Sequence, residues 1–105
     1  MAVPEIDVDE LDALGPATLQ LVDVREPDEF EQGRVPGARL VPLMTVPDTL
    51  DFFDSNRPVY LVCASGGRSF NAATFLIANG FEAVNVAGGT KAWIARGKET
   101  ESGPS

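Results

Sequence analysis

The sequence contains no histidine and a single cysteine, Cys63, among its 105 residues. One cysteine cannot form an internal disulfide, which fits a reducing compartment, so we expect a cytoplasmic protein. Zinc and other transition metals need several thiolate or imidazole ligands. The shortage of these side chains therefore argues against a metal site.

Positive charge is also scarce, because 8 Lys and Arg stand against 16 Asp and Glu, a net charge of −8. Such a chain is a poor partner for nucleic acid or for an anionic membrane. No apolar run approaches the ~20 residues that would span a bilayer. The first residues lack the basic and apolar regions of a secretion signal, so we expect none.

The length predicts one domain with its own core, and 44% apolar residues are ordinary for a globular protein. We expect this domain over residues 1–98 and a polar, frayed tail over 99–105. Glycine and proline punctuate alternating strand and helix patterns. After a short extended piece near Ile6, with Asp9 as the first helix cap, the predicted strands are 18–24, 38–41, 59–62 and 82–86, and the predicted helices are 9–14, 26–32, 47–54, 68–78 and 90–96.

This alternation predicts a parallel α/β sheet, whose ligands lie at the carboxyl ends of the strands. Cys63 stands at such an end, because the apolar run Val59–Val62 precedes it and the loop Ala64-Ser65-Gly66-Gly67-Arg68 leads into a helix. Backbone N–H groups in such a turn converge on an anion. The anion could be the thiolate, an anionic substrate, or both.

A free thiol is only about 3% ionised at neutral pH. Making most of it thiolate requires about 2.7 kcal/mol of stabilisation, more than the ~0.3–1 kcal/mol that a helix dipole usually supplies. We therefore expect loop N–H groups and the Arg68 guanidinium to contribute. Gly66 and Gly67 would let the backbone curl.

Each of these residues has a simpler structural interpretation. Cys63 could be a small buried hydrophobe, although its place at a strand end disfavours this. Arg68 could be a solvated cation and Ser65 a polar loop residue. We interpret Ser69 and Asn71 as residues that cap or decorate the helix.

A second group of charged residues follows another predicted strand. Asp23, Arg25 and Glu29 lie near its end, and we favour a structural charge network over a catalytic role. Trp93, at helical spacing from neighbouring apolar residues, is interpreted as core packing.

Four segments together resemble the single-domain rhodaneses, the thiosulfate and persulfide sulfurtransferases, over nearly all of residues 5–97. They are Asp-Val-Arg-Glu-Pro-Asp-Glu-Phe at 23–30, Gly-Arg-Val-Pro-Gly-Ala at 33–38, Cys-Ala-Ser-Gly-Gly-Arg-Ser at 63–69, and Gly88-Gly89 with Ala92-Trp93. Each segment alone is weak, but their order and spacing are specific. Arg34 replaces the histidine that is more common in the second segment.

The resemblance implies a five-stranded, mainly parallel sheet flanked by helices on both faces. It implies a catalytic Cys63 that carries a persulfide, with no cofactor. The substrate would be bound by Ala64, Ser65, Gly66, Gly67 and Arg68, with Asp23, Arg25 and Ser69 as structural neighbours. The implied partners are a small anionic sulfur donor and a thiol or protein acceptor, and we expect a monomer. The basic residues that accompany thiosulfate preference in some members are absent at Ala64 and Ser65.

Two other functions compete with sulfur transfer. The loop also resembles the C-x5-R loop of cysteine-dependent phosphatases and arsenate reductases, but Cys63 to Arg68 is C-x4-R. The shorter loop forms a smaller cradle, which is better suited to sulfur than to a phosphoryl group. A non-catalytic interaction module would most simply have lost the cysteine, which this chain retains.

Overall fold

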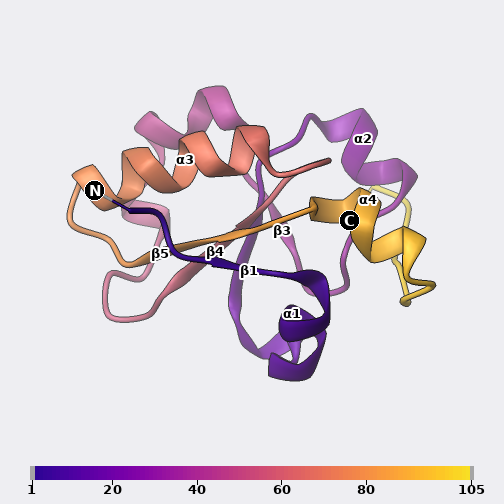
Figure 1. The fold of residues 1–105 in the computed structure, drawn as a ribbon. Helices are drawn as coiled ribbons and strands as arrows, with labels where there is room; N and C mark the ends of the chain where they lie inside the picture. Colours follow the sequence, from indigo (N-terminus) through magenta and orange to yellow (C-terminus); the bar gives the residue numbers. More distant parts are fainter. Residues whose placement is uncertain (1, 105) are drawn as a thin grey trace.

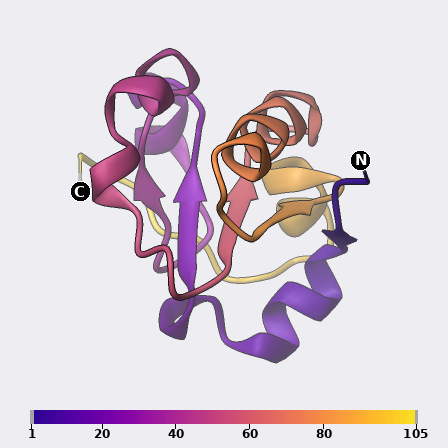
Figure 2. The ribbon, with the colours of Figure 1, turned by 90° about the vertical axis from the view of Figure 1, so that its left-hand side faces the viewer.

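The computed structural model describes residues 2–104 and contains one five-stranded sheet (Figure 1). Its order is β1-β5-β4-β2-β3, and every neighbouring pair is parallel. Figure 2 shows β2, β3 and β4 side by side with their arrowheads pointing the same way. The predicted α/β fold is confirmed, with strands β1 (Glu5–Ile6), β2 (Gln20–Asp23), β3 (Arg39–Leu40), β4 (Val59–Val62) and β5 (Ala83–Val86).

Helices cover both faces of this sheet, and in Figure 1 α3 and α1 lie on opposite sides of it. The α-helices are α1 (Val8–Leu14), α2 (Pro27–Gln32), α3 (Gly67–Ala78) and α4 (Gly89–Ala95). Three short 3₁₀ helices lie in the connections: η1 (Pro16–Thr18) between α1 and β2, and η2 (Leu43–Asp48) and η3 (Leu50–Phe52) between β3 and β4. No helix within residues 2–104 is long and apolar enough to cross a membrane.

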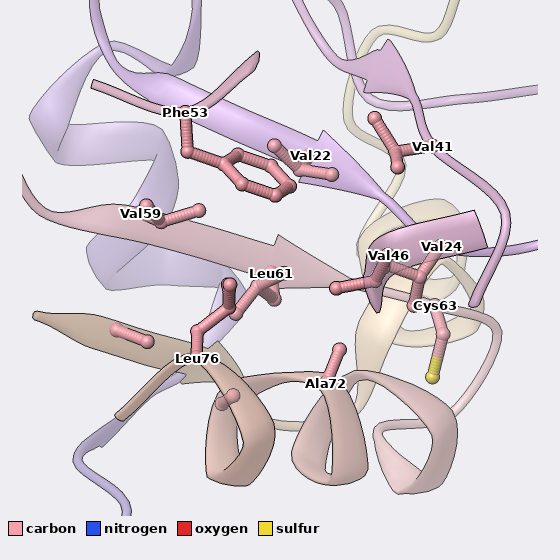
Figure 3. Packing of buried hydrophobic residues seen from close by; sticks show 12 residues of the cluster. Val22, Val24, Val41, Val46, Phe53, Val59, Leu61, Cys63, Ala72 and Leu76 are labelled. Atoms are coloured by element: carbon pink, nitrogen blue, oxygen red, sulfur yellow. The ribbon is translucent and has the colours of Figure 1, made fainter. Parts of the chain in front are cut away.

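The core consists of two clusters, one on each face of the sheet, because side chains alternate along a strand. On β4, Val59 and Leu61 pack with Leu76 of α3, whereas Val62 packs with Trp93 of α4. Cys63 continues the first set and lies in the α3-facing cluster (Figure 3). The two-residue period thus decides which face of the sheet carries the thiol.

Two local predictions were wrong in detail. The cap of α1 is Asp7, not Asp9: its carboxylate accepts from the Glu10 N–H at 2.8 Å, while the Glu10 side chain accepts from the Asp7 N–H. The expected helix over 47–54 is instead the 3₁₀ pair η2 and η3. Pro47 lies inside η2 and has no N–H to donate to a regular α-helix.

The tail also differs from the expected frayed segment, although Ser105 lies outside the described residues. The Glu99 carbonyl accepts from the Trp93 indole N–H at 2.7 Å, and Glu101 pairs with Arg34 in an antiparallel bridge. The buried Arg34 guanidinium donates to the Gly103 carbonyl at 2.6 Å. Buried donors need partners, and here backbone carbonyls of the tail supply them.

Candidate active site

Cys63 begins the loop after β4, where its carbonyl and its sulfur are both engaged. Its side chain is 1% exposed, and Sγ points toward the amino-terminal end of α3 (Figure 3). The loop between β4 and α3 therefore holds the sulfur beneath the protein surface. A substrate that reaches the sulfur must therefore pass residues of this loop or of the segments packed against it.

Two donors contact the sulfur directly. The Gly66 N–H lies 3.1 Å from Sγ, and the Ser69 hydroxyl donates to Sγ at 3.3 Å. Ser69 is fully buried on the first turn of α3. The expectation that Ser69 caps or decorates the helix was therefore wrong, because its hydroxyl is directed at the thiol.

The groups around Cys63 act in opposite directions on the pKa of its thiol. Burial raises the pKa of the thiol, but the Ser69 hydroxyl and the N–H groups of Ser69, Gly66 and Ser65 oppose it. Their combined effect holds the pKa of Cys63 below its ordinary value. Hydrogen bonds to the charged form thus outweigh desolvation.

The curl of the loop depends on Gly66, whose φ of 109° favours glycine. Its carbonyl accepts from the Phe70 N–H at 3.1 Å and from the Asn85 side-chain amide at 3.2 Å. Asn85 is itself held by Glu5 of β1 at 2.7 Å. These contacts turn the Gly66 N–H toward the sulfur.

The start of α4 supports the other side of the loop. The Thr90 N–H donates to the Cys63 carbonyl at 2.8 Å, and the Lys91 N–H donates to the Ala64 carbonyl at 2.9 Å. Gly89 makes this approach possible, because a Cβ there would lie 2.5 Å from the Cys63 carbonyl oxygen and 2.7 Å from that of Ala64. The Gly-Gly pair in this turn thus has a direct structural role at the site.

Arg68, expected to help stabilise the thiolate and to bind substrate, is engaged by Glu29. The guanidinium donates from Nη1 to Oε1 at 2.8 Å and from Nη2 to Oε2 at 2.9 Å. The Arg68 hydrogen bonds lower the pKa of Glu29 to about 2, and the Glu29 carboxylate raises the pKa of Arg68. Arg68 therefore lies beside the loop as half of a partly exposed ion pair, with no hydrogen bond to Sγ.

Asp23 and Arg25 form a buried pair behind the site, as the structural interpretation anticipated. Arg25 donates from Nη2 to Asp23 Oδ2 at 2.8 Å and to the Gly33 carbonyl at 2.9 Å. Asp23 Oδ1 also accepts from the Arg25 backbone N–H at 3.0 Å. This pair ties the segment after β2 to the end of α2 and does not contact the sulfur.

The remaining loop residues serve through their backbone. Ser65 and Gly67 are exposed and Ala64 is half-buried. No three side chains of His, Cys, Asp or Glu gather as metal ligands anywhere in residues 2–104. The sequence patterns did not identify Asn85 or the role of Glu29, since both act across the fold.

Comparisons with known proteins identify the family of the chain. The family described as rhodanese-like domain matches residues 7–96. The putative sulfurtransferase YtwF of Bacillus subtilis is 37% identical over 75 residues, 71% of this chain and 73% of that protein. A sulfurtransferase of Allochromatium vinosum is 37% identical over 78 residues, with 73% of each chain covered.

A solved structure gives the same result in three dimensions. The rhodanese-like domain protein of Staphylococcus aureus superposes with a TM-score of 0.84 and is 43% identical, covering 95% of this chain and 98% of that one. The shared fold and the order of motifs around Cys63 lead to one family assignment. The chain belongs to the rhodanese-like domain family.

Proposed function

We propose that this protein transfers sulfane sulfur through a persulfide on Cys63. The observation that carries the proposal is the sulfur of Cys63 held by the Gly66 N–H and the Ser69 hydroxyl, with its pKa lowered. Relatives named sulfurtransferase support a transferase of this type.

In the first step the Cys63 thiolate attacks the outer sulfur of a donor such as thiosulfate. A sulfur–sulfur bond forms to Cys63, the bond inside the donor breaks, and sulfite departs with the electron pair. No general base is needed when the nucleophile is already a thiolate. The persulfide that results carries negative charge, which the loop donors can stabilise as they do the thiolate.

In the second step an acceptor thiolate attacks the outer sulfur of the Cys63 persulfide. The bond to the Cys63 sulfur breaks, and the Cys63 thiolate leaves with the electron pair. It can then react with another donor. In an assay cyanide takes the same role and becomes thiocyanate. The chain has no second cysteine, so the acceptor is an external thiol or a partner protein.

Phosphatase or arsenate reductase chemistry fits this site less well. The loop is C-x4-R rather than C-x5-R, and both Nη atoms of Arg68 are bonded to Glu29. A phosphoryl group would need that guanidinium. We expect negligible Cys63-dependent hydrolysis of an aryl phosphate. Hydrolysis that approached the sulfur-transfer rate would favour phosphatase chemistry over sulfur transfer.

The proposal is tested by the intact mass of the protein after incubation with thiosulfate and, separately, with mercaptopyruvate. We expect the mass to increase by one sulfur atom, with peptide mapping to Cys63 and loss on adding cyanide. A protein that acquires no sulfur from either donor would favour a non-catalytic interaction module.

A further inference from the structure

A cavity of about 290 Å³ adjoins the Cys63 loop at Ala64. Its wall comes from the loop, from α2 and from α4, and it includes Arg25, Glu29, Ala64, Thr90, Lys91 and Ile94. At ~30 Å³ for each water molecule, the space suits roughly twice the heavy atoms of thiosulfate. Ala64 and the half-exposed Ile94 supply apolar surface for carbon atoms.

The charges of this wall are unequally paired. Arg25 is bound to Asp23, and Glu29 is bound to Arg68. Lys91 makes no ion pair within residues 2–104, and its side chain is exposed. The wall therefore presents one unpaired cation, which matches a ligand with one negative group.

Thr90 adds an unused polar group. Its hydroxyl is buried and has no hydrogen-bond partner in the described part of the chain. Native proteins seldom leave a buried hydroxyl unpaired. Thr90 also lines the cavity, so this unpaired hydroxyl lies close behind its wall.

Glu29 weakens anion binding at the loop, whereas Lys91 favours it. It occupies both Nη atoms of Arg68 and cancels the charge of the guanidinium beside Cys63. A dianion such as thiosulfate then gains little attraction from Arg68, because its charge is neutralised. The Glu29 carboxylate also repels the dianion. Each additional negative charge on a donor should weaken binding further.

We propose that the cavity binds a small organic thiol bearing one carboxylate, with Lys91 as its charge partner, and that Glu29 selects against the thiosulfate dianion. This inference rests on the proposed sulfur transfer. Glu29 acts through Arg68 and is a specificity-determining residue, not a catalytic one. Sulfur passes as described above, with the organic thiol as acceptor: its thiolate takes the outer sulfur of the Cys63 persulfide, and the Cys63 thiolate leaves.

The selection against dianions is tested with thiosulfate and methanethiosulfonate, a monoanionic donor that loses methanesulfinate instead of sulfite. We expect Glu29→Gln to raise the ratio of kcat/KM for thiosulfate to that for methanethiosulfonate about tenfold. Asp28→Asn is the matched control, because it removes the same charge from the exposed neighbouring residue on α2. An equal change in both variants, or none in Glu29→Gln, would overturn the role of Glu29.

The role of Lys91 is tested on the persulfidated protein with 3-mercaptopropionate and 2-mercaptoethanol, in which a hydroxyl stands in place of the carboxylate. Lys91→Gln should lower the preference for the carboxylate about twofold to fivefold, and Lys91→Arg should retain most of it. An unchanged preference in Lys91→Gln would overturn this assignment. If wild-type protein accepts sulfur from no donor, the proposed function itself fails, so the two failures are distinguishable.

Discussion

The Ser69 hydroxyl lies 3.3 Å from the Cys63 sulfur and donates to it from the first turn of α3. This bond makes Ser69 a positioning residue for the thiolate. Hydrogen bonds to charged groups contribute about 1.5–3 kcal/mol, comparable with the whole stabilisation that a reactive thiol needs. The neighbouring Gly66 N–H adds a second donor to the same sulfur.

Replacing Ser69 with alanine should raise the Cys63 pKa, because a donor to the charged form is lost. The rate of thiol alkylation should fall about tenfold at about pH 6 and converge with wild type at about pH 9, where the thiol ionises in both proteins. Asn71→Ala is the control, since Asn71 is exposed on the same helix. Superimposable titration curves for Ser69→Ala and wild type would remove Ser69 from the site.

Gly89→Ala should damage both stability and activity. The new Cβ would overlap the carbonyl oxygens of Cys63 and Ala64 at a φ of 60°, so we expect a loss of about 2–5 kcal/mol. Gly67→Ala serves as the comparison, because a Cβ there meets nothing within 4 Å. Urea unfolding should show Gly67→Ala unchanged or more stable by about 0.4–1 kcal/mol, and equal effects at the two glycines would contradict this account.

Removing the residues after Lys98 should destabilise the fold. The Trp93 indole N–H would lose its carbonyl partner and the buried Arg34 guanidinium would keep only that of Phe30, at about 1–3 kcal/mol for each group. Glu101→Ala keeps the backbone and should cost under about 0.5 kcal/mol. A truncated protein as stable as wild type would mean that the tail contacts contribute nothing.

The ion pair between Glu29 and Arg68 should contribute to stability only above acidic pH. The pKa of Glu29 is lowered from 4.5 to about 2 in the folded protein, so the folded state binds fewer protons than the unfolded state. The contribution is therefore fully present above the unfolded pKa and is lost as pH falls through 4.5 toward 2. The pair is partly exposed, so we expect at most about 1 kcal/mol.

This pH dependence can be measured as the difference in unfolding free energy between wild type and Glu29→Gln. The difference should be constant near neutral pH and shrink in acid. Asp28→Asn again provides the control at a carboxylate without an ion pair in residues 2–104. A difference that grows on acidification would contradict the lowered pKa of Glu29.

Much of the fold was predictable because it depends on local patterns. The apolar run of β4, the glycines that follow it and the apolar spacing of α3 are contiguous in the sequence. Their order also placed Cys63 at a carboxyl strand end. The cap of α1 was missed, although Asp7 stands three residues before Glu10, which is the spacing of a capping box. The structure shows this box, and Val8, directly after Asp7, is buried.

Contacts between distant segments could not be predicted from the sequence. Glu29 and Arg68 are 39 residues apart in the sequence, and no spacing rule joins them. Ser69 is close in sequence to Cys63, but its contact with the sulfur depends on the path that Gly66 gives the loop. The contacts of Arg68 and Ser69 therefore differed most from expectation, since they depend on side-chain direction.

The central claim is that sulfur travels on Cys63, and the most direct measurement is thiocyanate formation from a sulfane donor and cyanide by Cys63→Ser. Serine is nearly isosteric and can accept from the same Gly66 and Ser69 donors, so we expect the melting temperature to change little. Thiosulfate and methanethiosulfonate should both be used, so that donor preference does not mask the result. We predict that the variant forms no thiocyanate above background, and turnover like that of wild type would contradict the account.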